Sequence, residues 1–340
     1  MSFAVTAFRK RIGVTVTGPR HDDLTSPWDG MRAETSGVVD ARVRITSGRG
    51  EGDWVAAALT SGITTRLLES VAGELLLFHA AGLADDEGDV TLLVAASGRG
   101  KTTAARVLGR TRGYVTDETV AVDDLADDAV LPYRKPLSIA VTPGRPKAQL
   151  SPDVLGLRPL PATRLRASRV VLLSRDVAHT GPAVLSPVGL VDSIVELVPQ
   201  MSYLGLTEGA LRRLAGLIER TGGAMRIRYR DAEEIGDVLD RAGSGESTTT
   251  WRPVPWESRT PGIEFGEAVD AIATDESTLV LTRERLLVLG GIAPAILDAV
   301  ARGVPIADSV ARHHGEPHDA ERLIALRLGE LVEAGVLRHG

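Results

Sequence analysis

The chain has 340 residues and a formal net charge of −6, and this length predicts about two or three folded units rather than one ordinary single-core domain. Charges of both signs are mixed along the chain, which argues against a dedicated nucleic-acid binder with a basic face. Cysteine is absent, so disulfides, thiolate zinc sites and cysteine nucleophiles are excluded.

The N-terminal segment does not have the pattern of a signal peptide. Met1–Thr15 carries three cations but neither a continuous apolar run nor a small-residue cleavage site. No apolar stretch of the chain reaches the roughly 18 residues that a membrane span requires. We therefore expect a cytoplasmic protein without membrane or nucleic-acid partners.

Residues 1–74 predict a β-rich N-terminal lobe followed by a lead-in helix. Short apolar runs alternate with turn residues between Ala4 and Val43, which is typical of small strands. Apolar residues then recur at helical spacing over Trp54–Gly73.

Residues 75–243 predict an α/β domain in which a mixed sheet is flanked by helices, because strand-length apolar runs interleave with amphipathic segments. Expected strands are Leu75–Leu83, Val90–Ala95, Gly113–Val122, Ser168–Ser174 and Ala224–Tyr229. Expected helices are Lys101–Gly109, Gly189–Val198, Thr207–Thr221 and Ala232–Ala242.

Residues 244–262 are rich in Gly, Ser, Thr and Pro and predict a linker. Residues 263–340 then predict a small α+β domain of winged-helix type, with three short strands, three helices and a terminal strand. Its expected strands are Ala268–Ala273, Thr278–Thr282, Arg285–Leu289 and Val336–Arg338, and its helices are Pro294–Arg302, Ile306–His313 and His318–Gly335.

The segment Ala95–Thr102 reads A-A-S-G-R-G-K-T and lies between a predicted strand and a predicted helix. This is the context of a phosphate-binding loop, in which glycines allow unusual dihedrals and the helix N-terminus offers N–H groups to an anion. Lys101 would contact the β- and γ-phosphates, and the Thr102 hydroxyl would reach Mg²⁺. Ala95 departs from the usual first glycine. Residues expected to bind the nucleotide are Ser97, Gly98, Arg99, Gly100, Lys101, Thr102 and Thr103.

An acidic pair, Asp117-Glu118, begins about fifteen residues after Lys101, which leaves room for one helix to run out and one strand to return. The pair would therefore lie at a strand end near the phosphates, and the alternative is a solvated strand end. His79 lies on the strand before the loop, and its alternative is a core histidine. The guanine-reading sequence N-K-x-D does not occur.

Four cations follow the acidic pair in a proline-rich stretch, and we expect them to be solvated rather than in contact with phosphate or substrate. They are Arg134, Lys135, Arg145 and Lys147.

The order His79-Ala80-Ala81-Gly82, Ala95–Thr102 and Tyr114–Glu118 resembles the catalytic core of HPr kinase/phosphorylase, and more narrowly its relatives in biosynthetic clusters for ribosomally made, modified peptides. The resemblance covers residues 75–123 well. It implies ATP and Mg²⁺ as cofactors. It also implies Asp117 as the acceptor of the substrate proton, Lys101 as the countercharge of the phosphoryl group, and Thr102 with Glu118 as metal ligands. His79 would orient Asp117. No phosphorylase signature is found, so plain kinase activity is expected.

Phe265–Gly340 resembles the PqqD-like peptide-recognition family, with the pattern Ile306–Val310 and Leu328–Leu337 after a β-rich start. The resemblance implies that a leader peptide adds a strand at Ser277–Thr282, beside the helix His318–Glu333. A DNA-binding winged helix is the alternative, but the module lacks a dense basic face.

Together these features predict an ATP-dependent kinase that phosphorylates a hydroxyl, with serine of a ribosomal precursor peptide as the expected acceptor. A kinase of a small hydroxylated metabolite and a non-catalytic, nucleotide-gated regulator remain as alternatives. The sequence leaves the oligomeric state open, including assembly into a homo-oligomer.

Overall fold

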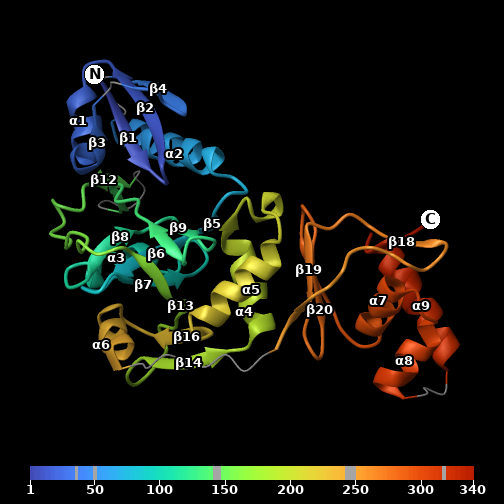
Figure 1. Cartoon of the computed structure of the whole chain (residues 1–340). Helices are drawn as coiled ribbons and strands as arrows, with labels where there is room; N and C mark the ends of the chain where they lie inside the picture. The colour runs from blue at the N-terminus through green and yellow to red at the C-terminus, as the bar shows by residue number, and fades with distance from the viewer. Residues whose placement is uncertain (35–36, 49–51, 141–146, 242–249, 316–318) are drawn as a thin grey trace. The chain divides into compact units, whose positions relative to one another are not determined.

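The computed structural model describes residues 1–34, 37–48, 52–140, 147–241, 250–315 and 319–340. The chain divides into two compact units, each built from segments that are distant in sequence (Figure 1). The first unit contains Met1–Gly189, Pro199–Tyr203 and Leu217–Ser247, and the second contains Leu190–Val198, Leu204–Gly216 and Thr248–Gly340. Within the described ranges, no helix is both long and apolar enough to cross a bilayer.

The first unit begins with a four-stranded sheet in the order β3-β1-β2-β4, packed against a long helix (Figure 1). Alternate residues of the second strand, Ile12, Val14 and Val16, are buried, as the two-residue period of a strand requires. They pack against Leu59 and Ile63, which lie one helical turn apart on the helix α2. The elements of this lobe are β1 (Ser2–Ala7), β2 (Lys10–Thr17), β3 (Arg32–Ala33), β4 (Ala41–Thr46), α1 (His21–Thr25), the 3₁₀ helix Ser26–Met31 and α2 (Gly52–Ser70).

The central sheet of the first unit has ten strands of mixed direction, which confirms the predicted α/β class. Strand β13 lies parallel to both β7 and β16, whereas β6 pairs antiparallel to β7 and β8. Along the main path the order is β15-β5-β9-β10-β13-β7-β6-β8, with β16 and β14 continuing from β13. The strands are β5 (Leu76–Phe78), β6 (Ala80–Ala84), β7 (Asp89–Val94), β8 (Gly113–Thr116), β9 (Val120–Asp123), β10 (Ala129–Leu131), β13 (Arg166–Arg175), β14 (Val184–Val188), β15 (Met201–Ser202) and β16 (Ala224–Tyr229).

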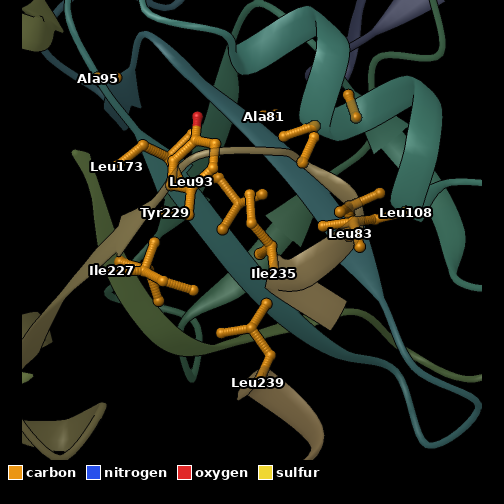
Figure 2. Packing of buried hydrophobic residues seen from close by; sticks show 14 of the residues in the cluster. Ala81, Leu83, Leu93, Ala95, Leu108, Leu173, Ile227, Tyr229, Ile235 and Leu239 are labelled. Carbon is orange, nitrogen blue, oxygen red and sulfur yellow. The ribbon is translucent and has the colours of Figure 1, made fainter. Parts of the chain in front are cut away.

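Two helices, α3 (Lys101–Leu108) and α6 (Glu233–Arg241), pack with the strands β6, β7, β13 and β16 around one apolar core. Figure 2 shows Leu108 from α3 with Ile235 and Leu239 from the α6 region in this cluster. A two-stranded sheet formed by β11 (Leu137–Ile139) and β12 (Ala148–Leu150) adds Leu137 to the same core. Helix α4 (Leu190–Leu197) and the 3₁₀ helix Leu204–Leu206 belong to the second unit, whereas α5 (Ala210–Arg220) and the 3₁₀ helix Val198–Gln200 each cross the division between the units.

Two predicted strands are each divided in the structure, and the breaks fall at candidate site residues. Leu75–Leu83 becomes β5 and β6, because these two strands pair with different neighbours and the N–H of His79 donates instead to Gln200 O at 2.7 Å. Gly113–Val122 becomes β8 and β9. The hydroxyl of Thr116 accepts the N–H groups of Glu118 (3.3 Å) and Thr119 (3.4 Å), which turns the chain at the acidic pair.

The second unit contains a four-stranded antiparallel sheet in the order β17-β19-β20-β21. The segment expected as a linker is packed where it is described: β17 pairs with β19, and the Trp256 ring stacks on Phe265 with centroids 4.4 Å apart. The elements are β17 (Arg252–Pro253), β18 (Ile263–Phe265), β19 (Asp270–Ala273), β20 (Thr278–Leu281), β21 (Leu286–Leu289), α7 (Ala293–Arg302), α8 (Ile306–His314), α9 (Ala320–Glu333) and β22 (Leu337–His339).

The strand expected to receive a peptide, Ser277–Thr282, is wrongly placed for that role. It forms β20, which pairs with β19 on one side and β21 on the other, so both of its hydrogen-bonding edges are used. Among the described residues, strand β21 pairs with β20 alone and is an edge of this sheet.

Gly82 provides a test of the packing between β6 and its neighbours. A Cβ at this position would lie 2.9 Å from Val120 Cγ2 and 3.1 Å from Val115 Cβ, so Gly82→Ala overpacks the sheet. We expect the free energy of unfolding to fall by about 1 to 3 kcal/mol in urea titrations. Gly48→Ala, at an exposed position where a Cβ meets open space, is the control and should change it by less than about 0.5 kcal/mol. Equal unfolding midpoints for the two variants would contradict this packing.

Candidate active site

The phosphate-loop sequence forms the turn between β7 and α3. Gly98 and Gly100 have φ angles of 78° and 100°, in the left-handed region that favours glycine, and Gly100 caps the N-terminus of α3. A Cβ on Gly100 would lie 3.0 Å from Tyr229 Oη, so a side chain there would also collide with the support of the loop. The free N–H groups of the first helical turn are therefore available to an anion.

The loop rests on the apolar core through two residues. Ala95 is buried in the core cluster, in the position where such loops usually carry their first glycine. Tyr229 is the last residue of β16, and its ring is packed in the same cluster while its hydroxyl donates to Arg99 O at 3.4 Å (Figure 2). The departure at Ala95 is thus accommodated by packing.

Lys101 is buried at the start of α3 and folds back onto the loop. Its Nζ donates to Ala95 O at 2.5 Å and to Ala96 O at 3.3 Å. Burial lowers the pKa of Lys101 to about 8, and the negative charges of Asp117 and Glu118 only partly oppose this effect. The ammonium therefore lacks a full countercharge, which a bound phosphate would supply.

The acidic pair lies between β8 and β9, and its two carboxylates differ in exposure. Asp117 is buried, and its Oδ1 accepts a hydrogen bond from Tyr114 Oη at 3.1 Å and forms an ion pair with Lys135 Nζ at 3.0 Å. Burial raises the pKa of Tyr114 well above its usual value, so its hydroxyl stays protonated and acts as a donor. Glu118 is about a third exposed in its side chain, and its Oε2 lies 3.0 Å from Lys135 Nζ.

Lys135 is a site residue, and the expectation that it is solvated is wrong. Its side chain is fully buried between the two carboxylates, whose charges raise its pKa against the effect of desolvation. In the sequence, the apolar residues Tyr133 and Leu137 lie two positions to either side of Lys135, the spacing at which side chains of an extended segment share one face, and this spacing could have identified it.

The other cations of the proline-rich stretch have different environments. Arg134 is half-buried, and its Nε donates to Tyr114 O at 3.2 Å, so it is not simply solvated. Lys147 is exposed and Arg145 lies outside the described residues.

His79 occupies the break between β5 and β6 and faces the backbone of the acidic pair. Its Nδ1 lies 3.0 Å from Glu118 O, and a carbonyl only accepts, so Nδ1 carries the hydrogen. Burial, with the nearby positive charge of Lys101, lowers the pKa of His79. The ring is therefore neutral near pH 7, with Nε2 as an acceptor.

One cavity of about 390 Å³ joins these elements. It contains every residue predicted for the site except Arg99, whose side chain is exposed and whose carbonyl meets Tyr229. Four further lining residues were not among the predicted site residues, namely Lys135, Ser138, Lys147 and Arg175. The predicted residues in the lining are His79, Ser97, Gly98, Gly100, Lys101, Thr102, Thr103, Asp117 and Glu118.

The lining residues fit a triphosphate with Mg²⁺. Thr102 and Glu118 both face the cavity, and Mg²⁺ is usually held by one or two such oxygen donors together with phosphates and water. Lys101 and the glycine-rich turn supply the cation and the N–H groups that phosphates require.

No protein-family model matches the chain, and comparison with curated proteins finds no match. Among solved structures, the HPr(Ser) kinase/phosphatase from Coxiella burnetii matches at 10% identity, over 48% of this chain and 93% of that chain, with a TM-score of 0.25. A TM-score of this size carries no argument about function. The functional proposal below therefore rests on the geometry of the cavity.

The pKa of Lys101 predicts a pH dependence of nucleotide binding. The ammonium is present in the free protein below about pH 8, and a bound phosphate raises its pKa, so affinity is full below this value and falls above it. We expect ATP to bind roughly tenfold more weakly at about pH 9 than at about pH 7, measured by titration calorimetry. Lys101→Met should bind weakly at both values. An affinity of the unchanged protein that is equal at the two values would contradict this assignment.

Proposed function

We propose that the chain is an ATP-dependent kinase that transfers the γ-phosphate to a hydroxyl group. The observation that carries this proposal is the single cavity in which the phosphate loop faces Asp117. A phosphate cradle alone serves many reactions, whereas a cradle beside a buried carboxylate supplies both the donor and the proton acceptor of a transfer.

Asp117 is suited to receive the proton of the attacking hydroxyl. Two donors occupy its Oδ1, and hydrogen bonds between described residues leave Oδ2 unengaged. The acceptor oxygen forms a bond to the γ-phosphorus, the bond to the bridging oxygen of the β-phosphate breaks, and ADP leaves. The hydroxyl proton goes to Asp117 Oδ2, so atoms and charge balance.

Lys101 and the turn around Gly98 and Gly100 would hold the phosphates and neutralise charge as the transfer proceeds. Thr102 and Glu118 would hold Mg²⁺, which when bound supplies further charge neutralisation on the phosphates. His79 would support the acidic pair through the hydrogen bond from its Nδ1–H to Glu118 O. Its other ring nitrogen, Nε2, is an acceptor and lies on the side of the ring away from that carbonyl.

We further propose that the acceptor is a serine of a ribosomally made precursor peptide whose leader binds the second unit. The edge strand β21 supports this part, because an edge strand presents unpaired N–H and C=O groups to an extended segment. The hydrogen bond from Thr282 N to Arg285 O at 2.9 Å determines which residue pairs of β20 and β21 exchange backbone hydrogen bonds. By the alternation of antiparallel pairs, the N–H of Val288 then points away from β20.

Asp117→Asn tests the transfer. The amide cannot take the proton, so we expect kcat for transfer of labelled γ-phosphate to fall by about 10²- to 10⁴-fold while ATP binding is retained. Glu87→Gln, at an exposed turn, is the matched control and should keep full activity. Transfer that survives in Asp117→Asn would remove Asp117 from this role. A protein that binds ATP but transfers phosphate to no hydroxyl would support the nucleotide-gated regulator instead.

Val288→Pro tests recognition through β21. Proline removes the outward N–H without breaking the ladder to β20, so we expect KM for a peptide with its leader to rise roughly tenfold, with kcat and the rate on a leaderless peptide unchanged. Val288→Thr keeps the N–H and is the control. An unchanged KM would exclude strand addition at β21, and phosphorylation of small hydroxylated molecules alone would replace the peptide as acceptor.

A further inference from the structure

Lys135 occupies a bridging position between the two carboxylates of the acidic pair. Its Nζ lies 3.0 Å from Asp117 Oδ1, 3.0 Å from Glu118 Oε2 and 3.0 Å from Pro136 O. The ammonium group donates a hydrogen bond to Pro136 O and forms ion pairs with both carboxylates. The side chain is fully buried, so this is a built contact and not a surface ion pair.

The charge of the acidic pair makes this cation necessary. Two adjacent carboxylates, one of them buried, are costly unless opposite charge compensates them. Metalloenzymes commonly place a divalent ion between two such carboxylates, at 2.0 to 2.6 Å from the oxygens for Mg²⁺ or Ca²⁺. Here the ammonium takes that place, and a second cation cannot share it.

We propose that Lys135 acts as a built-in counter-cation that replaces a bridging metal ion between Asp117 and Glu118. It neutralises one of the two negative charges and engages one oxygen of each carboxylate. Asp117 Oδ2 and the second oxygen of Glu118 then remain for separate tasks. Lys135 is a positioning residue, because it acts through the carboxylates.

This inference deepens the proposed function and rests on it for the roles of those oxygens. With one carboxylate charge already neutralised, the site is arranged for a single Mg²⁺ that Glu118 shares with the phosphates.

The residues that flank Lys135 in the chain hold it in this position. Tyr133 and Leu137 on either side are fully buried, and Tyr133 Oη bonds to Thr64 Oγ1 at 2.8 Å.

The test is cation binding by the full chain without nucleotide. Lys135→Met removes the ammonium and leaves the two carboxylates facing a vacated bridging position. We expect this variant to gain a saturable Mn²⁺ site, seen by electron paramagnetic resonance and by a rise in Tm with added Mn²⁺. The double variant Asp117→Asn/Lys135→Met should lose the gained site.

Two further variants keep the test decisive. Lys135→Gln retains a polar group and gives the same reading where the methionine variant does not fold. Lys147→Met removes an exposed lysine from the same cavity and should gain no Mn²⁺ site. A Lys135 variant that binds Mn²⁺ no better than the unchanged protein overturns the inference, as does a wild-type Mn²⁺ site that Asp117→Asn abolishes.

Kinetics separate this inference from the proposed function. If both hold, Lys135→Met lowers kcat by about 10²-fold with little change in KM for ATP, because the phosphate loop is untouched. Absent kinase activity of the unchanged protein, together with a gained Mn²⁺ site, would reject the kinase and keep the counter-cation. Normal kinase activity of the unchanged protein, together with no gained Mn²⁺ site in Lys135→Met, would keep the kinase and reject the counter-cation.

Discussion

The buried contact of Lys135 with Asp117 and Glu118 is the interaction on which the first unit's cavity depends. Without it, the buried carboxylate after β8 would lack its ion-pair partner, and an unpaired buried charge is strongly destabilising. The contact also depends on packing against the N-terminal lobe. Tyr133 packs edge-to-face on Phe8 and bonds to Thr64, so the lobe fixes the extended segment from which Lys135 reaches the acids.

A second constraint comes from the parallel strands β7, β13 and β16. Their carboxyl ends lie at the same end of the sheet. The phosphate loop after Val94 therefore lies near Arg175 and Tyr229, the paired last residues of β13 and β16. Ligand sites of α/β sheets form at such carboxyl ends. The apolar core beneath, with Ala95 and the Tyr229 ring, holds the loop in place before any phosphate arrives.

The sequence predicted those parts of the site that depend on neighbours along the chain. The phosphate loop, its strand and its helix are local features, and most element bounds agree within a few residues. The breaks at His79 and at the acidic pair were missed, because both runs are apolar and the breaks depend on partners such as Gln200 and on side-chain bonds of Thr116. Lys135 was missed because a lysine among prolines resembles surface chain, although its two-residue spacing from the apolar residues Tyr133 and Leu137 indicated otherwise.

The balance of charge in the cavity connects these observations. Asp117 and Glu118 are offset by Lys135 and Lys101, and the two lysines are not equivalent. Lys135 has its carboxylate partners at hydrogen-bond distance and its pKa is raised, whereas Lys101 reaches only carbonyl oxygens and its pKa is lowered. The first lysine therefore belongs to the permanent structure. Under the proposed function, the triphosphate brings negative charge to Lys101 at the loop without disturbing Lys135.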